Sequence, residues 1–92
     1  MIFIEINYND VDNSFIIIDI RDNLSYQRKH IKNAINISFI NLIINPKKHL
    51  NKTNKYLLVC EYGIKSKKTS EILNKQGYKT YSLINGMKMY NK

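Results

Sequence analysis

The sequence has one cysteine, Cys60, and its position suggests a nucleophile. It begins the segment Cys60-Glu61-Tyr62-Gly63-Ile64-Lys65-Ser66. If this segment curls around the sulfur, the backbone amides from Glu61 to Ser66 converge above it as an anion-binding nest, and Gly63 permits the backbone angles that such a curl requires. These donors, with a helix N-terminus and nearby lysines, favour a thiolate, which attacks sulfur readily. The same donors would hold an anionic sulfur donor or the terminal sulfur of a persulfide.

Two strands are expected to position this segment. Phe15–Ile20 and Tyr56–Cys60 are nearly continuous apolar runs, which are typical of strands buried on both faces of a parallel sheet. Parallel strands need long crossover connections, so the runs predict an α/β fold with helices between the strands. In such sheets ligands bind at the carboxyl ends of the strands, where Cys60 lies.

Helix and turn signals occupy the remaining segments. After the cysteine we expect a helix that opens at Lys65 or Ser66, with Ser66 as its N-cap and Gly77 at its left-handed end. One face of that helix should carry Thr69, Ile72, Leu73 and Gln76. Two further helices are predicted: one is capped by Asp22 or Asn23 with Leu24 inward, and the other has Ile40, Ile43 and Ile44 on one face and stops before Pro46. The remaining predictions are a first strand with Ile2, Ile4 and Ile6 on one face, strands at 35–37 and 80–83, a polar turn at 51–55 and a helical turn at 86–90.

Length and composition limit the classes of protein that this chain can represent. Its 92 residues, 43% of them apolar, predict one domain over residues 1–92. No apolar run approaches the roughly 20 residues that a membrane helix needs, and the N-terminus lacks the features of a signal peptide, so we expect a cytoplasmic protein without a membrane partner. A single cysteine excludes an intramolecular disulfide and leaves too few sulfur ligands for an ordinary zinc site, so neither a metal nor a cofactor is expected.

The net charge of +8 would attract anions, but 13 of the 15 basic residues are lysines scattered along the chain. We interpret them mainly as a solvated surface. An aromatic platform or a recognition-helix pattern is missing, so no nucleic-acid partner is predicted.

Four motifs, in this order and spacing, resemble the rhodanese family. They are Asp19-Ile20-Arg21 with Tyr26, then His30 to Ile37, then Cys60-x-x-Gly63-x-Lys65-Ser66 with Leu73, Gly77 and Tyr78, and finally Leu83-Ile84-Asn85-Gly86-Met87 through Tyr90. The resemblance implies a rhodanese-like α/β fold, a five-stranded parallel sheet flanked by helices on both faces. It also implies a sulfurtransferase that passes sulfane sulfur from thiosulfate or a protein persulfide to a thiol or protein acceptor.

Carried onto this sequence, the resemblance makes Cys60 the nucleophile that carries the persulfide. It places substrate binding on the loop residues Glu61, Tyr62, Gly63, Ile64, Lys65 and Ser66. Lys65 stands where the family frequently has arginine, and it would bind the donor as a point charge rather than through a bidentate fork. Asn33 replaces a glycine of the first motif, and asparagine tolerates the left-handed conformation that this turn requires.

Other polar residues near the motifs have plainer interpretations. We expect Asp19 and Arg21 to form a structural pair and His30 to pack and hydrogen-bond at a helix end. Glu61 would oppose ionisation of the thiol unless its carboxylate points away, in which case it favours a cationic or protein partner. Tyr62 and Ile64 either shape access for the donor or are simply exposed.

Three alternatives compete with a sulfurtransferase. Cys60 can be a buried core residue, the commoner fate of a free cysteine. A cysteine phosphatase needs arginine six positions after the cysteine, where this chain has Ser66. A non-enzymatic sulfur carrier or docking domain of the same fold shares the first chemical step, so the sequence does not separate it from a free-standing enzyme.

Overall fold

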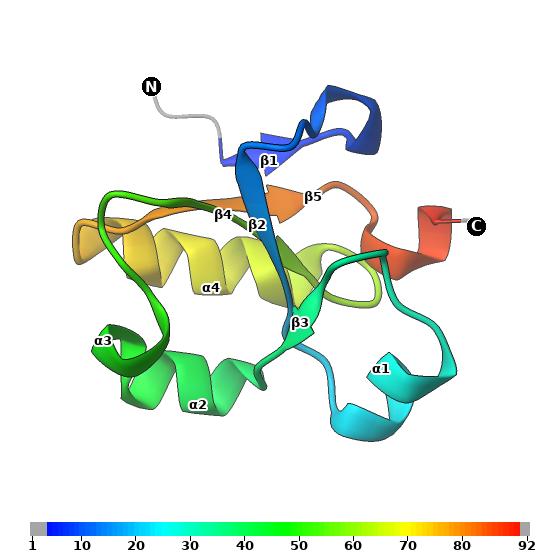
Figure 1. Ribbon diagram of the computed structural model, residues 1–92, viewed down its shortest axis with the longest axis horizontal. Coiled ribbons are helices and arrows are strands. Elements are labelled where there is room, and N and C mark those ends of the chain that lie inside the picture. Colours follow the sequence, from blue (N-terminus) through cyan, green and yellow to red (C-terminus); the bar gives the residue numbers. More distant parts are fainter. Residues whose placement is uncertain (1–3, 91–92) are drawn as a thin grey trace.

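Five parallel strands form one sheet in the order β1-β5-β4-β2-β3, so the two strongly apolar strands lie side by side at its centre (Figure 1). The computed structural model describes residues 4–90. Its elements are β1 (Glu5–Ile6), the 3-10 helix η1 (Tyr8–Asp10), β2 (Phe15–Asp19), α1 (Asn23–Arg28), β3 (Ile35–Asn36), α2 (Phe39–Ile44), α3 (Pro46–His49), β4 (Lys55–Val59), α4 (Ile64–Lys75), β5 (Lys79–Leu83) and the 3-10 helix η2 (Gly86–Met89). This confirms the predicted five-stranded parallel α/β fold.

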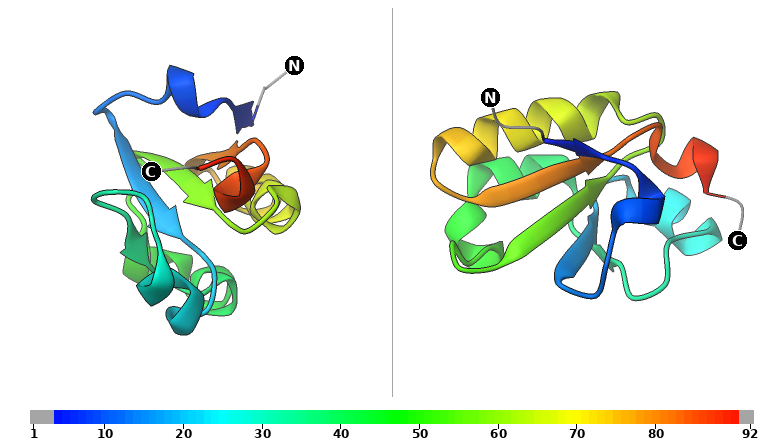
Figure 2. Two further views of the ribbon diagram at one scale, coloured as in Figure 1. Left: turned by 90° about the vertical axis from the view of Figure 1, so that its right-hand side faces the viewer. Right: turned by 90° about the horizontal axis from the view of Figure 1, so that it is seen from above.

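Alternate residues of the central strands fill two separate cores. On one face, Ile18 and Leu58 pack with Leu42 and Leu73 of the helices α2 and α4. The other core lies on the opposite face, where Tyr26 of α1 and Met87 of η2 pack with side chains that include Leu57, Val59 and Leu83. Helical segments therefore cover both faces of the sheet, as Figure 2 shows. Within residues 4–90, no helix has the length and apolar character needed to cross a membrane.

The helix α1 begins where the sequence predicts, but its inward face differs. Asp22 caps it by accepting a hydrogen bond from the Ser25 amide. Leu24, predicted to point inward, is 67% exposed, and Tyr26 fills that role by packing into the core and donating a hydrogen bond to the Ala34 carbonyl. The helix has only six residues, so tertiary contacts rather than local periodicity decide which face is buried.

The predicted inward face of the next helix is wrong for two of its three isoleucines, because only Ile43 is half-buried. Leu42 of α2 is fully buried, whereas Ile40 and Ile44, one turn apart, are mostly exposed. The helix does end before Pro46, as predicted, but the chain then starts the short helix α3, with Pro46 in its first turn, a position that tolerates a residue without an amide hydrogen.

The C-terminal half matches the predicted order of elements. Gly77 has φ +97° just after α4, and β5 and η2 follow at the expected places. On α4, Leu73 and Thr69 are buried as predicted, whereas Ile72 and Gln76 are exposed. Near the N-terminus, β1 contains Ile6, which packs against the second core, while Ile2 lies outside the described residues.

Candidate active site

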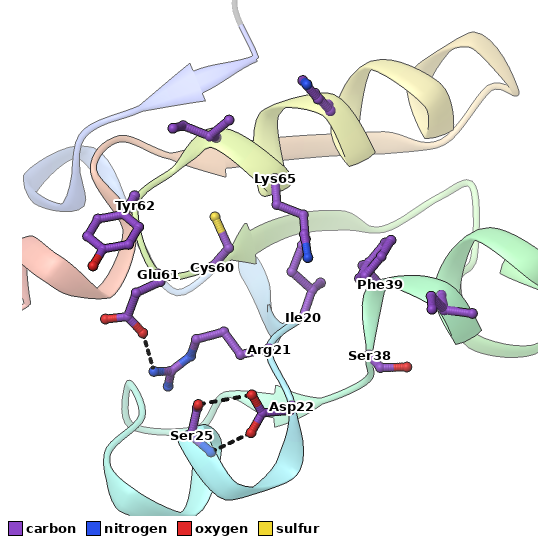
Figure 3. A pocket seen from close by; sticks show the side chains of 13 residues that line it. Ile20, Arg21, Asp22, Ser25, Ser38, Phe39, Cys60, Glu61, Tyr62 and Lys65 are labelled. Carbon is purple, nitrogen blue, oxygen red and sulfur yellow. Dashed lines mark hydrogen bonds and ion pairs between the residues drawn. The ribbon is translucent and has the colours of Figure 1, made fainter.

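Cys60 lies immediately after β4, between the ends of two flanking strands. Its residue is only 5% exposed, and its side chain belongs to the core beneath α2 and α4. A buried cysteine alone would fit the interpretation of Cys60 as core filler. Cys60, however, also lines an open pocket of about 680 Å³ (Figure 3).

The sulfur caps the helix that follows it. Gly63 is the N-cap residue of α4, in the left-handed conformation at φ +86°, and it has no side chain with which to cap. Cys60 Sγ instead accepts hydrogen bonds from the amides of Gly63, at 3.1 Å, and of Ser66, at 3.3 Å. The Ser66 amide is the third of the helix, the donor that a capping oxygen usually takes. The positive end of the α4 dipole therefore points at the sulfur and favours negative charge there.

This geometry corrects the predicted start of the helix. The helix α4 begins at Ile64, one or two residues before the predicted start at Lys65 or Ser66, because its N-cap is Gly63 in the left-handed conformation. Ser66 is consequently not the N-cap. It lies in the first turn, fully buried, with its hydroxyl 3.2 Å from Cys60 Sγ.

A chain of two buried hydroxyls lies behind the sulfur. Cys60 Sγ contacts Ser66 Oγ, which is 2.6 Å from Ser82 Oγ on β5, and the Ser82 hydroxyl is 3.4 Å from the carbonyl oxygen of Gly63. Because either serine can be the donor between the two hydroxyls, the chain can donate toward the sulfur or accept from it. Sequence reasoning did not identify Ser82, although a polar residue on the buried face of a predicted strand is an available signal.

The final helical turn fixes the outer side of the loop. The amides of Met87 and Lys88 donate to the carbonyls of Cys60, at 2.9 Å, and of Glu61, at 3.0 Å. Gly86 begins this turn at φ +56°, and a Cβ at this position would overlap the carbonyl oxygen of Cys60. These bonds hold the two carbonyls on the η2 side of the loop.

The loop's first residue, Glu61, is tied to the end of β2. Arg21 donates to Glu61 at 3.1 Å and forms a two-pronged pair with the fully buried carboxylate of Asp19. Hydrogen bonding to Asp19, and then the charges of Asp19 and Glu61, raise the pKa of Arg21. The predicted Asp19–Arg21 pair is confirmed. The carboxylate of Glu61 shares the single positive charge of Arg21 with Asp19 and is half-exposed, so its expected preference for a cationic or protein partner stays a prediction.

The pocket is lined by residues from three segments: the end of β2 with the start of α1, the start of α2, and the loop after β4 with the first turns of α4. Its lining residues are Ile20, Arg21, Asp22, Ser25, Ser38, Phe39, Ile40, Cys60, Glu61, Tyr62, Ile64, Lys65 and Lys68. Lys65 lies with Nζ 4.1 Å from the centre of the Phe39 ring, a cation–π contact on the pocket wall. Asp22 lies on the α1 side, and hydrogen bonds from the Ser25 amide and hydroxyl lower the pKa of Asp22.

The predicted loop residues occupy distinct positions. Gly63 and Ser66 donate amide hydrogens to the sulfur, whereas the amides of Glu61, Tyr62, Ile64 and Lys65 have no acceptor among residues 4–90. The side chains of Tyr62 and Ile64 are both exposed at the pocket.

His30 does not line the pocket. Its Nδ1 is 2.8 Å from the Tyr26 carbonyl and its ring stacks on Tyr26, as expected of a packing residue. Among residues 4–90, no group of three or more His, Cys, Asp or Glu side chains is arranged to hold a metal ion.

Comparisons with known proteins give a consistent family. The model of the rhodanese-like domain matches residues 5–92. The thiosulfate sulfurtransferase GlpE of Coxiella burnetii is 37% identical over 76 residues, which cover 82% of this chain and 70% of that protein. Among solved structures, a rhodanese-related protein from Thermoplasma volcanium superposes with a TM-score of 0.84 at 24% identity, over 96% of this chain and 90% of the other. A protein from Helicobacter pylori superposes with a TM-score of 0.72 at 29% identity, over 89% of this chain and 76% of the other.

Proposed function

Because the chain belongs to the rhodanese-like domain family, we propose that it transfers sulfane sulfur from thiosulfate or a protein persulfide to a thiophilic acceptor, through a persulfide on Cys60. The observation that carries the proposal is Cys60, whose sulfur accepts hydrogen bonds from two amides at the start of α4 and which lines an open pocket. A cysteine that only fills the core would need neither hydrogen bonds from backbone amides nor a place at a pocket.

In the first half-reaction the Cys60 thiolate attacks the sulfane sulfur of the donor. With thiosulfate, a new S–S bond forms to Cys60, the S–S bond of the donor breaks, and its electron pair leaves on sulfite. The α4 dipole and the Ser66 hydroxyl stabilise the attacking anion. While Cys60 is a thiol, its S–H group donates a hydrogen bond to Ser66 Oγ, and the proton goes to solvent when the thiol ionises. After ionisation the Ser66 hydroxyl turns and donates to the sulfur, and Ser82 donates to Ser66 Oγ.

In the second half-reaction an acceptor attacks the terminal sulfur of the persulfide. With cyanide the products are thiocyanate and the Cys60 thiolate. The terminal sulfur carries the negative charge in the intermediate, so it needs new donors further out than Cys60 Sγ. The amides of Tyr62, Ile64 and Lys65 have no acceptor within residues 4–90, and they lie on the loop that borders the pocket. We assign them to this charge.

The proposal includes a reducing compartment such as the cytoplasm, where a lone thiol stays reduced between cycles. A passive carrier would load sulfur in the same way but release it only to a protein acceptor.

Steady-state formation of thiocyanate from thiosulfate and cyanide tests the proposal. Wild type should turn over, and Cys60→Ala should not. Cys60→Ser is the matched control, because its hydroxyl can still cap α4 while it cannot form a persulfide. Equal turnover by wild type and Cys60→Ser would contradict a role for the sulfur. A persulfide that forms on Cys60 but gives no thiocyanate with cyanide would identify a sulfur carrier.

A further inference from the structure

Lys65 and Phe39 meet at the wall of the pocket beside Cys60. Lys65 lies in the first turn of α4, Phe39 is the first residue of α2, and both line the pocket (Figure 3). The Lys65 Nζ lies 4.1 Å from the centre of the Phe39 ring. A cation at this distance over an aromatic face is attracted by the ring, so the contact links α4 to α2.

Phe39 is the fixed member of this pair. Its amide donates a hydrogen bond to the Ile20 carbonyl at 3.2 Å, directly after β2, and its ring packs against the core that contains Cys60. Lys65 is exposed, and its long side chain is flexible. An exposed ammonium on such a side chain samples many positions unless a contact restricts it. The ring of Phe39 therefore decides where the ammonium of Lys65 lies.

Positive and negative charges around the pocket nearly cancel. The carboxylates of Asp22 and Glu61 line it, and Glu61 shares the single positive charge of Arg21 with the buried carboxylate of Asp19. The two lysines on α4 that line the pocket oppose these charges. The total charge of the pocket therefore gives an anion little attraction, and binding depends on where an individual cation is held.

Lys65 is held at this pocket without being neutralised. Among residues 4–90 no ion pair joins its ammonium to Asp22 or Glu61. The ring that holds it carries no net charge, so the positive charge of Lys65 stays available to an anion. Lys68, three residues later on α4, has neither an ion pair nor a ring contact in the described part of the chain, so nothing fixes its ammonium.

We propose that Phe39 is a positioning residue for anions that react at Cys60: its ring holds the ammonium of Lys65 at the pocket wall and keeps it from pairing with the pocket carboxylates. This inference rests on the proposed function, in which an anionic sulfur donor binds with its charged group toward Lys65 and its sulfane sulfur toward Cys60. Without the ring, the ammonium turns toward Asp22 or Glu61, and its charge is lost to the incoming anion.

Alkylation of Cys60 by iodoacetate and by iodoacetamide tests the proposal. With either reagent the thiolate forms a bond to carbon and iodide leaves, but only iodoacetate carries a negative charge. The ratio of the iodoacetate rate to the iodoacetamide rate, followed by intact mass, therefore reports attraction of an anion and is independent of the reactivity of the thiolate. In Phe39→Met and in Lys65→Gln we expect this ratio to fall about threefold. Phe39→Tyr keeps an aromatic ring and should keep the wild-type ratio.

Phe15→Met is the matched control for loss of an aromatic ring. Phe15 of β2 also has a lysine 4.1 Å from its ring centre, Lys55, but it does not line the pocket, so its replacement should leave the ratio unchanged. Phe39→Met combined with Lys65→Gln should lower the ratio no further than Lys65→Gln alone, a result that a loss of packing would not produce. Phe39→Leu provides a second variant without the ring if Phe39→Met does not fold.

An unchanged ratio in the variants that lack the Phe39 ring, or an equal decrease in Phe15→Met, would overturn the positioning role. A further decrease in the double variant would overturn it too. Loading of wild type by thiosulfate and by glutathione persulfide is measured alongside. If either donor loads Cys60 while the ratio does not change, the positioning role fails and the proposed function stands. If the ratio changes as expected but neither donor loads Cys60, the proposed function fails and the positioning of Lys65 stands.

Discussion

The guanidinium of Arg21 lies 3.1 Å from the carboxylate of Glu61, 40 residues further along the chain, and joins the loop after Cys60 to the end of β2. The same guanidinium pairs with Asp19, whose carboxylate is buried. One arginine thus anchors the loop and shares its single positive charge between two carboxylates, one of which belongs to the residue directly after Cys60.

Replacing Arg21 is expected to destabilise the fold strongly. Arg21→Met leaves the buried carboxylate of Asp19 without a counter-charge, at a cost of about 3–5 kcal/mol in the free energy of unfolding. Glu61→Gln breaks only the half-exposed pair and should cost less than about 1 kcal/mol. Urea unfolding measures the free energy of unfolding of both variants. Similar losses in the two variants would show that the pair with Asp19 is not the more important one. Because the pKa of Arg21 is raised in the folded protein, the stabilisation by its ion pairs is fully present at any pH below the ordinary pKa of arginine. It is therefore constant through neutral pH.

The hydroxyl chain behind the sulfur gives a second prediction. Ser66→Ala removes a donor to the thiolate and should slow loading by thiosulfate about tenfold or more in single turnovers. Ser82→Ala acts through Ser66 and should slow loading less. The matched control is Ser70→Ala, because the buried Ser70 hydroxyl on α4 has no hydrogen-bond partner within residues 4–90. A loading rate for Ser66→Ala equal to that of Ser70→Ala would contradict the role of the chain.

The close approach of η2 to the loop gives a third prediction. In Gly86→Ala the new Cβ overlaps the Cys60 carbonyl oxygen, so the loop must move and thiocyanate formation should fall even in the folded fraction. Gly77→Ala is the control, because Gly77 also has a positive φ but its Cβ would contact only the flexible Lys52 side chain, at 3.4 Å. It should cost about 1 kcal/mol of stability and leave turnover per folded molecule unchanged. Equal turnover by the two variants would show that the η2 contact does not position the loop.

The cap of α1 gives a pH-dependent prediction. Hydrogen bonds from the Ser25 amide and hydroxyl lower the pKa of Asp22, so the charged cap contributes stability above the ordinary carboxyl value of 3.8 and loses it as the pH falls through the lowered value. The melting temperature of wild type should exceed that of Asp22→Ala at neutral pH, and the gap should narrow in acid. A gap that is constant down to strongly acidic pH would mean that the charge plays no part.

Local patterns predicted the strands and the reactive loop because these depend on short-range features. The apolar run of β4 is buried on both faces, and that of β2 is buried at its carboxyl end although Ile16 is 39% exposed. Gly63 is suited to the left-handed turn after Cys60. The inward faces of α1 and α2 were mispredicted at Leu24 and Ile40. Each of these helices has six residues, too few for periodicity to outweigh the tertiary contacts that orient it.

Contacts between distant segments were not predictable from the sequence. Nothing near Glu61 identifies Arg21 as its partner, and Ser66 looked like a helix cap because its contact with Ser82 depends on how α4 packs on β5. The sulfur of Cys60, rather than the side chain of an N-cap residue, accepts the hydrogen bonds at the start of α4. The residue preferences at N-caps do not predict this arrangement.

Intact mass after incubation with thiosulfate tests the central claim most directly. Wild type should gain one sulfur atom, about 32 Da, and lose it on addition of cyanide, while Cys60→Ser gains none. A wild-type mass that does not change, or the same gain in Cys60→Ser, would contradict a persulfide on Cys60.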